Sequence, residues 1–481
     1  MLSALLALPV QAERKPNIIF VLADDLGYGD LGCFGSKHIK TPHLDQMAEE
    51  GMILTDFYSG ATVCAPSRCV LMTGLHMGHC WVRGNANNSM KQTLQPGEIT
   101  IPGELKKAGY ATALFGKWGL GELDSVGHPM KHGFDDFYGY LNQRHAHNFY
   151  PEFIIDRYEK VRLRNRYDPA WIKMRTEQGR EDDGAGWATP ETKLDYVPDL
   201  VMERTYRWME EVKDEPFFLY LALNMPHANN EATRGTGDGQ EVPDYGIYAD
   251  KDWPNPDKGQ AAMVTRMDGY IGELISRLKK WGIDEHTLII FTSDNGPHAE
   301  GGNNMEFFDA NGPVRGMKRD LTDGGIRVPT IARWPGTVPA GTKSSRPAYF
   351  GDVLATSCEI AGLPVPEGRD SLSFLATLKG AKEQPPAPYL YWESYEKGGK
   401  QALRMGKWKA VREPWIGGEI QLFDVRADIG EEVDRAGQNP EVVEQVEAYM
   451  EAAHTRSEHW TPPVPKKRKQ PAAPKKRPVT S

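Results

Sequence analysis

Two apolar segments of the sequence, residues 16–23 and 287–293, are rich in β-branched side chains and are typical of buried strands in a parallel sheet. Each is followed at once by oxygen-bearing side chains, namely Asp24, Asp25, Asp294 and Asn295. Neighbouring carboxylates oppose each other's ionisation unless a positive charge lies between them. An all-oxygen ligand set suits calcium or magnesium and disfavours zinc. The pattern predicts a site for a hard divalent cation, although Asp and Asn also end strands in ordinary turns.

A cysteine begins a further distinctive segment, Cys64-Ala65-Pro66-Ser67-Arg68, which is followed by a Thr-Gly pair at residues 73 and 74. The proline at an early position and the apolar residues after it predict a helix that begins near Cys64. Free N–H groups and the dipole at the start of a helix favour anions. We therefore expect Cys64 to lie beside a position for an anionic substrate.

These motifs, in this order, resemble those of the type I sulfatases of the alkaline-phosphatase superfamily, and the resemblance spans residues 15–434. In that family the cysteine is oxidised by a maturation enzyme to Cα-formylglycine, whose hydrated aldehyde attacks sulfur. The resemblance implies that Cys64 is this nucleophile. It also implies a bound Ca²⁺, or Mg²⁺ in its place, held by Asp24, Asp25, Cys64, Asp294 and Asn295.

Four further side chains match catalytic positions of the same family, namely Arg68, Lys117, His227 and Lys318. By the resemblance, Arg68 holds the formylglycine hydrate, and the two lysines bind sulfate. In-line displacement at sulfur moves negative charge onto the departing oxygen. The three cationic side chains and the metal would stabilise the charge on the other sulfate oxygens. His227 would protonate the leaving oxygen as a general acid.

The chain departs from the family pattern at two positions. Gly119 stands where a histidine is usual, and that histidine is a candidate base for the release of sulfate. His76 and His298 are the available replacements, unless the diol collapses with help from Lys117 and the metal. Asp323 stands where glutamate is usual, which keeps the charge and shortens the side chain.

The segment from Asn142 to Tyr150 combines amide, cationic and aromatic side chains, a mixture that suits the hydroxyls and the C–H face of a sugar. We take Arg144, His145, His147 and His298 as candidate substrate-binding residues. Arg144 is suited to a neighbouring carboxylate or a second sulfate. A solvated loop is the alternative. The expected partner is a sulfated carbohydrate.

Strand and helix patterns alternate along the chain and predict an α/β fold with a large mixed, mostly parallel sheet between helices. We expect helices at residues 41–50, 101–108 and 261–281, with Gly259 outside the last helix, and strands at 111–115 and 216–223. Residues 150–190 show no clean period and predict a loop-rich insertion over the pocket. The predicted catalytic domain covers residues 13–365.

A Pro-, Gly- and Lys-rich stretch at residues 364–388 predicts a boundary. Beyond it, residues 380–460 predict a small C-terminal α+β subdomain with an antiparallel sheet. Its strands are expected at residues 389–392, 401–411 and 420–423, and its closing helix at 442–454. Five cysteines, one of them Cys64, are too few for a disulfide scaffold in a chain of 481 residues.

The two ends of the chain carry different signals. Residues 1–12 resemble the apolar core and cleavage site of a signal peptide, which predicts export to the periplasm or the exterior. Residues 461–481 form a Pro- and Lys-rich tail that we expect to be disordered. The net charge is −9, and we expect no nucleic-acid partner. No stretch is apolar for long enough to predict a transmembrane segment.

Three functions fit these observations. The first is hydrolysis of sulfate esters of carbohydrates. The second is hydrolysis of phosphoric or phosphonic esters by an enzyme of the same superfamily. The third is a binding protein that keeps the fold but not turnover, because Cys64 stays a thiol or because Gly119 disables release.

Overall fold

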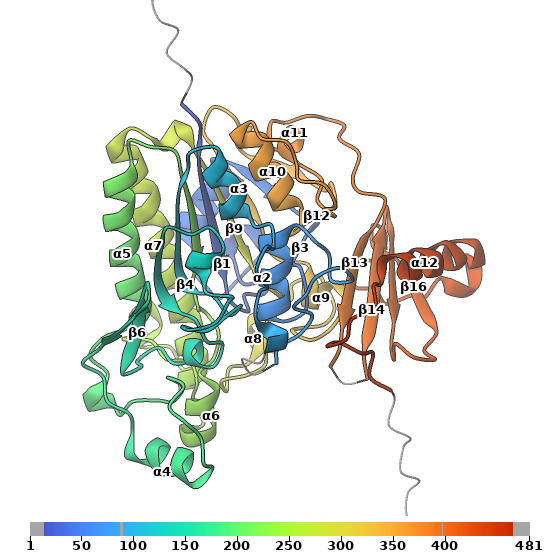
Figure 1. Ribbon diagram of the computed structural model, residues 1–481. Coiled ribbons are helices and arrows are strands. Elements are labelled where there is room, and N and C mark those ends of the chain that lie inside the picture. Colours follow the sequence, from blue (N-terminus) through green and yellow to red (C-terminus); the bar gives the residue numbers. More distant parts are fainter. Residues whose placement is uncertain (1–13, 87–89, 397, 465–481) are drawn as a thin grey trace, which may run out of the picture.

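The computed structural model describes residues 14–86, 90–396 and 398–464. A ten-stranded sheet runs through the centre of the molecule, in the order β11-β2-β10-β9-β1-β8-β4-β5-β6-β7 (Figure 1). Its strands are β1 (Asn17–Ala23), β2 (Met52–Leu54), β4 (Ala111–Lys117), β5 (Asp136–Tyr140), β6 (Phe153–Asp156), β7 (Glu159–Arg162), β8 (Phe217–Ala222), β9 (Thr287–Ser293), β10 (Ile331–Arg333) and β11 (Thr342–Ser344).

The five middle strands, from β9 to β5, are parallel, and antiparallel pairs lie toward both edges. Every residue of β1, β8 and β9 is buried, as expected for strands that are covered on both faces. The predicted mixed, mostly parallel sheet is therefore confirmed. Because the middle strands point the same way, their carboxyl ends meet at one edge, where ligands bind in open sheets of this kind.

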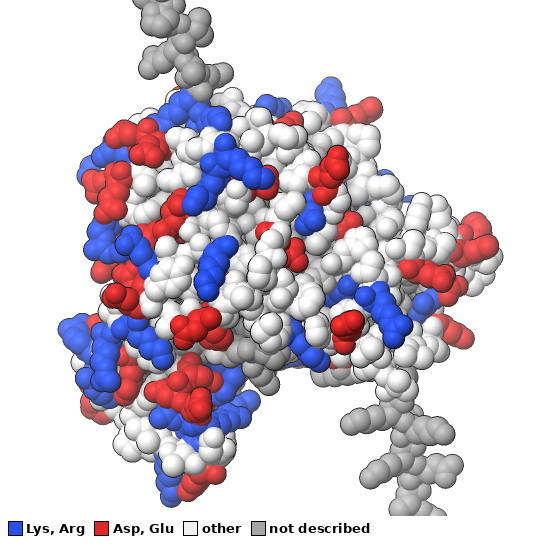
Figure 2. All heavy atoms as spheres, in the orientation of Figure 1, with Lys and Arg blue, Asp and Glu red and all other residues white. Residues whose placement is uncertain are grey.

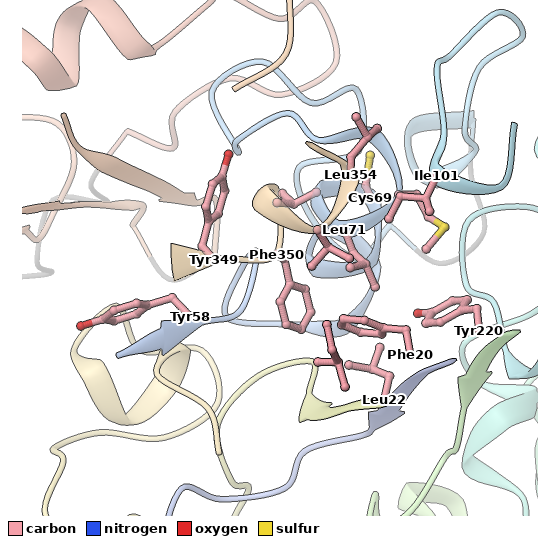
Figure 3. Close-up of a cluster of buried hydrophobic side chains, with 14 of the residues drawn as sticks. Phe20, Leu22, Tyr58, Cys69, Leu71, Ile101, Tyr220, Tyr349, Phe350 and Leu354 are labelled. Carbon is pink, nitrogen blue, oxygen red and sulfur yellow. The ribbon is translucent and has the colours of Figure 1, made fainter. Parts of the chain in front are cut away.

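Helices cover both faces of the sheet (Figure 1). One face packs against α1 (Pro42–Glu49), α5 (Val197–Val212) and α7 (Asn255–Trp281), and the other against α2 (Cys64–Thr73), α3 (Ile101–Lys107) and α10 (Asp352–Ala361). Figure 3 shows the second layer, in which Phe20 and Leu22 of β1 and Tyr220 of β8 lie below Leu71 of α2 and Leu354 of α10. This packing fixes the start of α2 relative to the strand ends.

One helix begins earlier than expected. α7 starts at Asn255, so the prediction that Gly259 lies outside the helix is wrong. A Cβ atom on Gly259 would lie 2.4 Å from the carbonyl oxygen of Gln240. The glycine interrupts the apolar period because the neighbouring backbone comes too close for a side chain.

The segment at residues 150–190 contains more regular structure than expected. It forms the hairpin of β6 and β7, which extends one edge of the sheet, and the helix α4 (Pro169–Glu177). α4 lies near α6 (Asn230–Thr236) at one end of the molecule (Figure 1). Trp171 and Trp187 pack together there in a small cluster apart from the main cores. These elements bury too few apolar residues to show a period in the sequence.

The C-terminal part is a four-stranded antiparallel sheet with one helix packed against it. Its elements are β13 (Leu390–Ser394), β14 (Lys400–Met405), β15 (Trp408–Arg412), β16 (Ile420–Asp424) and α12 (Pro440–Ala453). The single strand expected at residues 401–411 is a hairpin that turns at Gly406, which has a φ of +57°.

The C-terminal sheet joins the main body through buried contacts. Trp392 donates a hydrogen bond from Nε1 to the carbonyl oxygen of Ser59 at 2.9 Å, and its ring packs on that of Tyr58. Close to this contact, two short strands pair in parallel, β3 (Phe57–Tyr58) and β12 (Ala348–Tyr349). Three further short helices lie in connecting segments, α8 (Met305–Phe308), α9 (Asp323–Ile326) and α11 (Leu375–Leu378).

The predicted signal peptide lies outside the described residues, and so does most of the basic tail. Over the part of the chain that is described, no helix combines the length and apolarity that crossing a bilayer requires. Acidic and basic side chains are interspersed over the face shown in Figure 2, and neither sign forms a broad continuous area there.

Candidate active site

The predicted oxygen ligands meet at the carboxyl ends of two neighbouring strands. In the register of β1 and β9, Ala23 pairs with Ser293, so the residues that follow each strand lie side by side. Asp24, Asp25, Asp294 and Asn295 all have exposed fractions of 0%. Asp25 has a φ of +67°, a left-handed conformation that Asp tolerates better than most residues. In this turn the N–H of Asp25 donates a hydrogen bond to Oδ1 of Asp294 at 3.2 Å, and Oδ1 of Asp25 accepts one from Nδ2 of Asn295 at 2.7 Å.

The cysteine lies at the start of its helix, as the sequence predicts. α2 begins at Cys64, and its N-cap residue, Val63, offers no side-chain hydrogen bond to the first N–H groups. The Sγ atom of Cys64 lies 3.3 Å from Oδ1 of Asp24. Ser67, one turn along, donates a hydrogen bond to the carbonyl oxygen of Asp294 at 2.6 Å. The helix start is thereby held against the strand ends.

Three cationic side chains converge on the carboxylates. Arg68 Nη2 lies 2.8 Å from Asp294 Oδ2, Lys117 Nζ lies 2.6 Å from Asp24 Oδ2, and Lys318 Nζ lies 2.6 Å from Asp25 Oδ2. Arg68 also donates from Nη1 to the carbonyl oxygen of Lys117 at 2.5 Å. Lys117 comes from the end of β4, whereas Lys318 comes from the long connection after β9.

His227 completes the cluster from the loop after β8. Its Nε2 atom lies 3.1 Å from Lys318 Nζ and 3.4 Å from Asp25 Oδ2, and its Nδ1 atom lies 2.7 Å from the carbonyl oxygen of Ala228. The contact through Nδ1 orients the ring, so that Nε2 faces the charged groups. The structure thus brings together all of the predicted nucleophile, metal and catalytic positions.

The donor set fits a hard cation. The Oδ1 atom of Asn295 is buried and has no hydrogen-bond partner among the described residues. This oxygen is therefore available to bind a metal ion. Ligand atoms of Asp24, Asp25, Cys64 and His227 lie within 4.8 Å of one another. Burial and the nearby Asp24 raise the pKa of Asp294 to about 7. A divalent cation would favour its charged form.

The surroundings of Cys64 disfavour a thiolate. Burial, with Asp24 and Asp294 nearby, raises the pKa of the Cys64 thiol well above its ordinary value. An unmodified cysteine here is therefore a weak nucleophile. Burial, reinforced by Lys318, holds the pKa of His227 well below its ordinary value.

The residues predicted to bind substrate have different surroundings. The ring of His147 stacks on that of His227, with centroids 4.6 Å apart, and the ring of His298 stacks on the same histidine at 5.9 Å. Arg144 lies next to His147, because both contact the carboxylate of Glu231. His145 instead places Nε2 3.0 Å from the carbonyl oxygen of Phe153 and is 2% exposed, which gives it a packing role in this structure.

The position of the missing histidine is already filled. Gly119 has a φ of +80°, and a Cβ atom there would lie 2.3 Å from Nε2 of Gln143. This amide nitrogen is buried and has no hydrogen-bond partner in the described parts of the chain. A side chain at residue 119 would therefore require Gln143 to move from its present position.

His76 is not brought to the site. It lies beyond the end of α2, whose length of ten residues corresponds to about 15 Å, whereas Cys64 opens that helix. Its ring stacks on that of His79, with centroids 4.2 Å apart, and both histidines face Asp370. Nδ1 of His76 accepts a hydrogen bond from the N–H of Gly78. This cluster satisfies its own polar groups.

Two acidic residues near the cluster were not anticipated. Glu300 Oε2 lies 3.8 Å from Lys318 Nζ, and Glu231 Oε2 lies 3.2 Å from His147 Nδ1. Neither follows a strand directly, so the pattern that revealed Asp24 and Asp294 offered no signal for them. Glu231 and Glu300 both lie in long connections between strands, at the carboxyl edge of the sheet.

Comparison with known proteins agrees with this geometry. The Sulfatase family model matches residues 16–363. N-acetylgalactosamine-6-sulfatase of Rattus norvegicus is 33% identical over 86% of this chain and 74% of its own length. N-acetylgalactosamine-6-O-sulfatase of Bacteroides thetaiotaomicron is 28% identical over 93% of this chain and 94% of its own.

The fold leads to the same group of proteins. A solved structure of Ps i-CgsB in complex with k-i-k-neocarrahexaose superposes with a TM-score of 0.73 and 29% identity, over 91% of this chain and 92% of that one. The fold and the site define an alkaline-phosphatase-like hydrolase. The chain belongs to the sulfatase family, whose members are sulfuric ester hydrolases.

Proposed function

We propose that this protein hydrolyses sulfate esters of a carbohydrate, with a formylglycine made from Cys64 as nucleophile and a bound Ca²⁺, for which Mg²⁺ can substitute. The observation that carries the proposal is the position of Cys64, 3.3 Å from Asp24 at the edge where three cationic side chains and His227 converge. The proposal includes export and a formylglycine-generating maturation enzyme as partner.

The metal would be held by Asp24, Asp25, Asp294 and Asn295, with the side chain at residue 64 as a further ligand. When bound, it supplies a Lewis acid that draws charge from a sulfate oxygen. The hydrated aldehyde would supply the hydroxyl that attacks sulfur. Its second hydroxyl would lose a proton to a base as the aldehyde forms again and sulfate departs.

The chain's own residues perform the other tasks. Arg68 and Lys117 bridge the helix start and the strand end, so they would fix the nucleophile and the sulfate oxygens at once. Lys318 lies between Asp25 and His227 and would bind a sulfate oxygen close to the leaving group. His227 is oriented by the contact of its Nδ1 with the carbonyl oxygen of Ala228. The negative charge of a bound sulfate ester would oppose the effect of Lys318 and favour the imidazolium, whose Nε2–H would protonate the departing alkoxide.

Two observations favour a sugar as the leaving group. The relatives named above act on N-acetylgalactosamine 6-sulfate, and the similar structure holds a neocarrahexaose. In this chain, His147 stacks on His227 at the side where the leaving group would depart, and it lies among polar side chains. Such a wall offers donors and acceptors for hydroxyl groups.

The test compares two substrates, an aryl sulfate and an aryl phosphate, and then variants of two buried cysteines on the same helix. The protein co-expressed with a maturation enzyme should release sulfate from an aryl sulfate faster than phosphate from the matching aryl phosphate. Mass spectrometry should find the aldehyde at residue 64. Cys64→Ala should lose activity by at least a thousandfold, whereas Cys69→Ala, five residues along α2, should keep it. Faster phosphate release would instead support the phosphoric ester hydrolase.

A further inference from the structure

The backbone turns sharply just after Lys318. Arg319 has a φ of +80°, a left-handed conformation that residues with a side chain rarely adopt. The N–H of Lys318 donates a hydrogen bond to the carbonyl oxygen of Pro297 at 2.9 Å, and the N–H of Arg319 donates one to the carbonyl oxygen of Thr62 at 3.0 Å. Pro297 lies just after the oxygen ligands that follow β9, and Thr62 lies just before the nucleophile. The turn is therefore bonded to both halves of the candidate active site.

The two side chains of this turn have different surroundings. The side chain of Lys318 is 3% exposed and lies in the catalytic cluster, whereas that of Arg319 is 35% exposed. Arg319 Nη1 lies 2.7 Å from Oε1 of Glu300, in the loop after β9. Its Nε lies 3.3 Å from Oε2 of Glu396, which follows β13. Arg319 thus links a loop of the active site to the C-terminal sheet.

Glu300 connects this link to Lys318. Its Oε2 atom is buried, has no hydrogen-bond partner among the described residues, and lies 3.8 Å from Nζ of Lys318. One carboxylate therefore faces a guanidinium with one oxygen and an ammonium with the other. Asp25, the other carboxylate in contact with Lys318, is an assigned metal ligand, whereas Glu300 is not. A carboxylate held by Arg319 attracts the ammonium and restricts its position.

Other contacts hold the same connection without reaching the catalytic cluster. Asp320 Oδ1 lies 3.3 Å from Nζ of Lys400. The carbonyl oxygen of Leu321 accepts a hydrogen bond from Nζ of Lys409 at 2.7 Å. The connection then leads into α9, which lies between α2 and the C-terminal sheet (Figure 1). Arg319 differs from these residues, because the carboxylate that it holds also faces a catalytic lysine.

The backbone at residue 319 would accept glycine more readily than arginine. Glycine adopts left-handed conformations freely, whereas a side chain makes them costly. Strain of this kind persists where the surrounding structure imposes it, often at functional sites. The presence of an arginine is therefore explained by the contacts of its side chain.

We propose that Arg319 is a positioning residue that acts through Glu300 on Lys318. By fixing Oε1 of Glu300, it keeps Oε2 in place and holds the ammonium of Lys318 where it would bind a sulfate oxygen. This inference rests on the role of Lys318 in the proposed function.

The test is a double-mutant cycle with Lys318. Arg319→Gly relieves the backbone and removes both ion pairs, so the melting temperature should stay within about 4 °C of the parent value. Its kcat/KM on an aryl sulfate should nevertheless fall about tenfold or more, because a displaced ammonium binds the reacting sulfate less well. In a Lys318→Ala background, Arg319→Gly should change kcat/KM less than about twofold. Calorimetric titration with inorganic sulfate measures the same cycle as binding affinity where turnover is too slow to follow.

Arg157 provides the matched control. It is another arginine with a left-handed backbone, at a φ of +53°, and its Nε lies 2.9 Å from Oδ1 of Asp136. It lies between β6 and β7, the two outermost strands at one edge of the main sheet, so Arg157→Gly should leave kcat/KM unchanged.

The outcomes separate this inference from the proposed function. The inference is overturned if Arg319→Gly loses no more activity than Arg157→Gly, or loses the same factor with and without Lys318, while the parent protein still hydrolyses the aryl sulfate. A Lys318→Ala variant as active as the parent would instead overturn the role of Lys318, and this inference with it. A parent protein that releases no sulfate would overturn the proposed function itself.

Discussion

Cys64 illustrates at the scale of one residue why the proposed modification suits this site. Its thiol is buried beside two carboxylates, and both burial and their negative charge oppose ionisation. The same surroundings suit an aldehyde hydrate, which is neutral and donates hydrogen bonds to carboxylates. Arg68 and Lys117 then act on the bound sulfate, because neither has to stabilise a thiolate.

Gly119 provides the first residue-scale prediction. Gly119→Ala places a side chain on a left-handed backbone and against the side chain of Gln143. Gly282→Ala has a similar backbone strain, at a φ of +69°, but no neighbouring atom lies within 4 Å of its Cβ position. We expect Gly282→Ala to lower the free energy of unfolding by about 1–2 kcal/mol, and Gly119→Ala to lower it further. Urea denaturation measures both. Equal losses would mean that Gln143 moves aside freely.

The same contact explains why the family histidine cannot simply be restored. Gly119→His should lower both stability and activity, since its Cβ would displace the amide of Gln143. In the double variant with Gln143→Ala, the free energy of unfolding should recover in part. If Gly119→His alone is as stable as the parent protein and turns over faster, the geometry at this position has been misread.

Gln143 itself leads to a prediction about turnover. Its amide nitrogen is buried, lacks a partner in the described structure, and lies against Gly119, two residues after Lys117. We expect this donor to reach a sulfate oxygen or the diol when a substrate is bound. Gln143→Ala should lower kcat on an aryl sulfate about tenfold or more, with a burst of alcohol product if release becomes slow. Gln260→Ala, which removes another buried and incompletely bonded amide in α7, should not change kcat.

At the scale of elements, the strand ends were the most predictable part of the molecule. The apolar runs before Asp24 and Asp294 indicated buried strands, and parallel neighbours bring the residues after such strands to one edge. The order of strands was not predictable, because β8 lies between β1 and β4 through long-range pairing. Gly259 was misread for a similar reason, since only the distant Gln240 reveals why a glycine is needed in α7.

The ends of β1 and β9 also carry the prediction for metal removal. Chelation should abolish activity and lower the melting temperature, because ligand binding stabilises the folded state by about 3 kcal/mol at a hundredfold excess over Kd. The three buried carboxylates would then keep only Arg68, Lys117 and Lys318 as counter-charges. Added Ca²⁺ should reverse both effects. In Asp25→Asn, chelation should have little further effect. A parent protein that keeps its activity after exhaustive chelation, or binds zinc stoichiometrically, would contradict the assigned ligands.

At the scale of the whole molecule, the junction between the main body and the C-terminal sheet depends on Asp323. Its Oδ1 atom lies 2.9 Å from Nζ of Lys409 in β15, and its backbone N–H donates to Glu431 at 2.6 Å. Tyr58 and Arg327 contact the other carboxylate oxygen. The sequence marked Asp323 only as a departure from the family pattern, because Lys409 and Glu431, its partners in the C-terminal part, lie 86 and 108 residues away.

This junction predicts a large difference between two neighbouring lysines. Lys409→Met removes the cation that contacts both Asp323 and Glu431 and leaves Asp323 with Arg327 alone. We therefore expect the free energy of unfolding to fall by about 3–5 kcal/mol. Lys407→Met removes an ion pair with Asp424 in which the lysine side chain is 47% exposed, and should change it by less than about 1 kcal/mol. Chemical denaturation compares the two. Similar losses would mean that the buried pair contributes no more than a surface pair.

Buried histidines determine how the stability of the whole molecule depends on pH. Burial lowers the pKa of His76, His128 and His145 to about 4 in each case, from an ordinary value of 6.5. The unfolded chain therefore binds more protons than the folded chain between these values. Their contribution to stability is complete above about pH 6.5 and is lost as the pH falls toward 4. Each contributes at most about 3 kcal/mol.

Several buried carboxyls, with Asp30 and Asp352 as examples, change stability in the opposite direction, so a comparison of variants is needed. Burial raises the pKa of Asp30 and Asp352 to about 7, so the folded state holds these protons longer and loses stability as the pH rises from 4 to 7. His145→Gln keeps an N–H donor for the carbonyl oxygen of Phe153 but cannot be protonated in this range. Urea denaturation at pH 7 and pH 4.5 should show a smaller loss of stability on acidification for His145→Gln than for the parent protein. An unchanged loss would mean that His145 accepts a proton in the folded state as readily as in the unfolded chain.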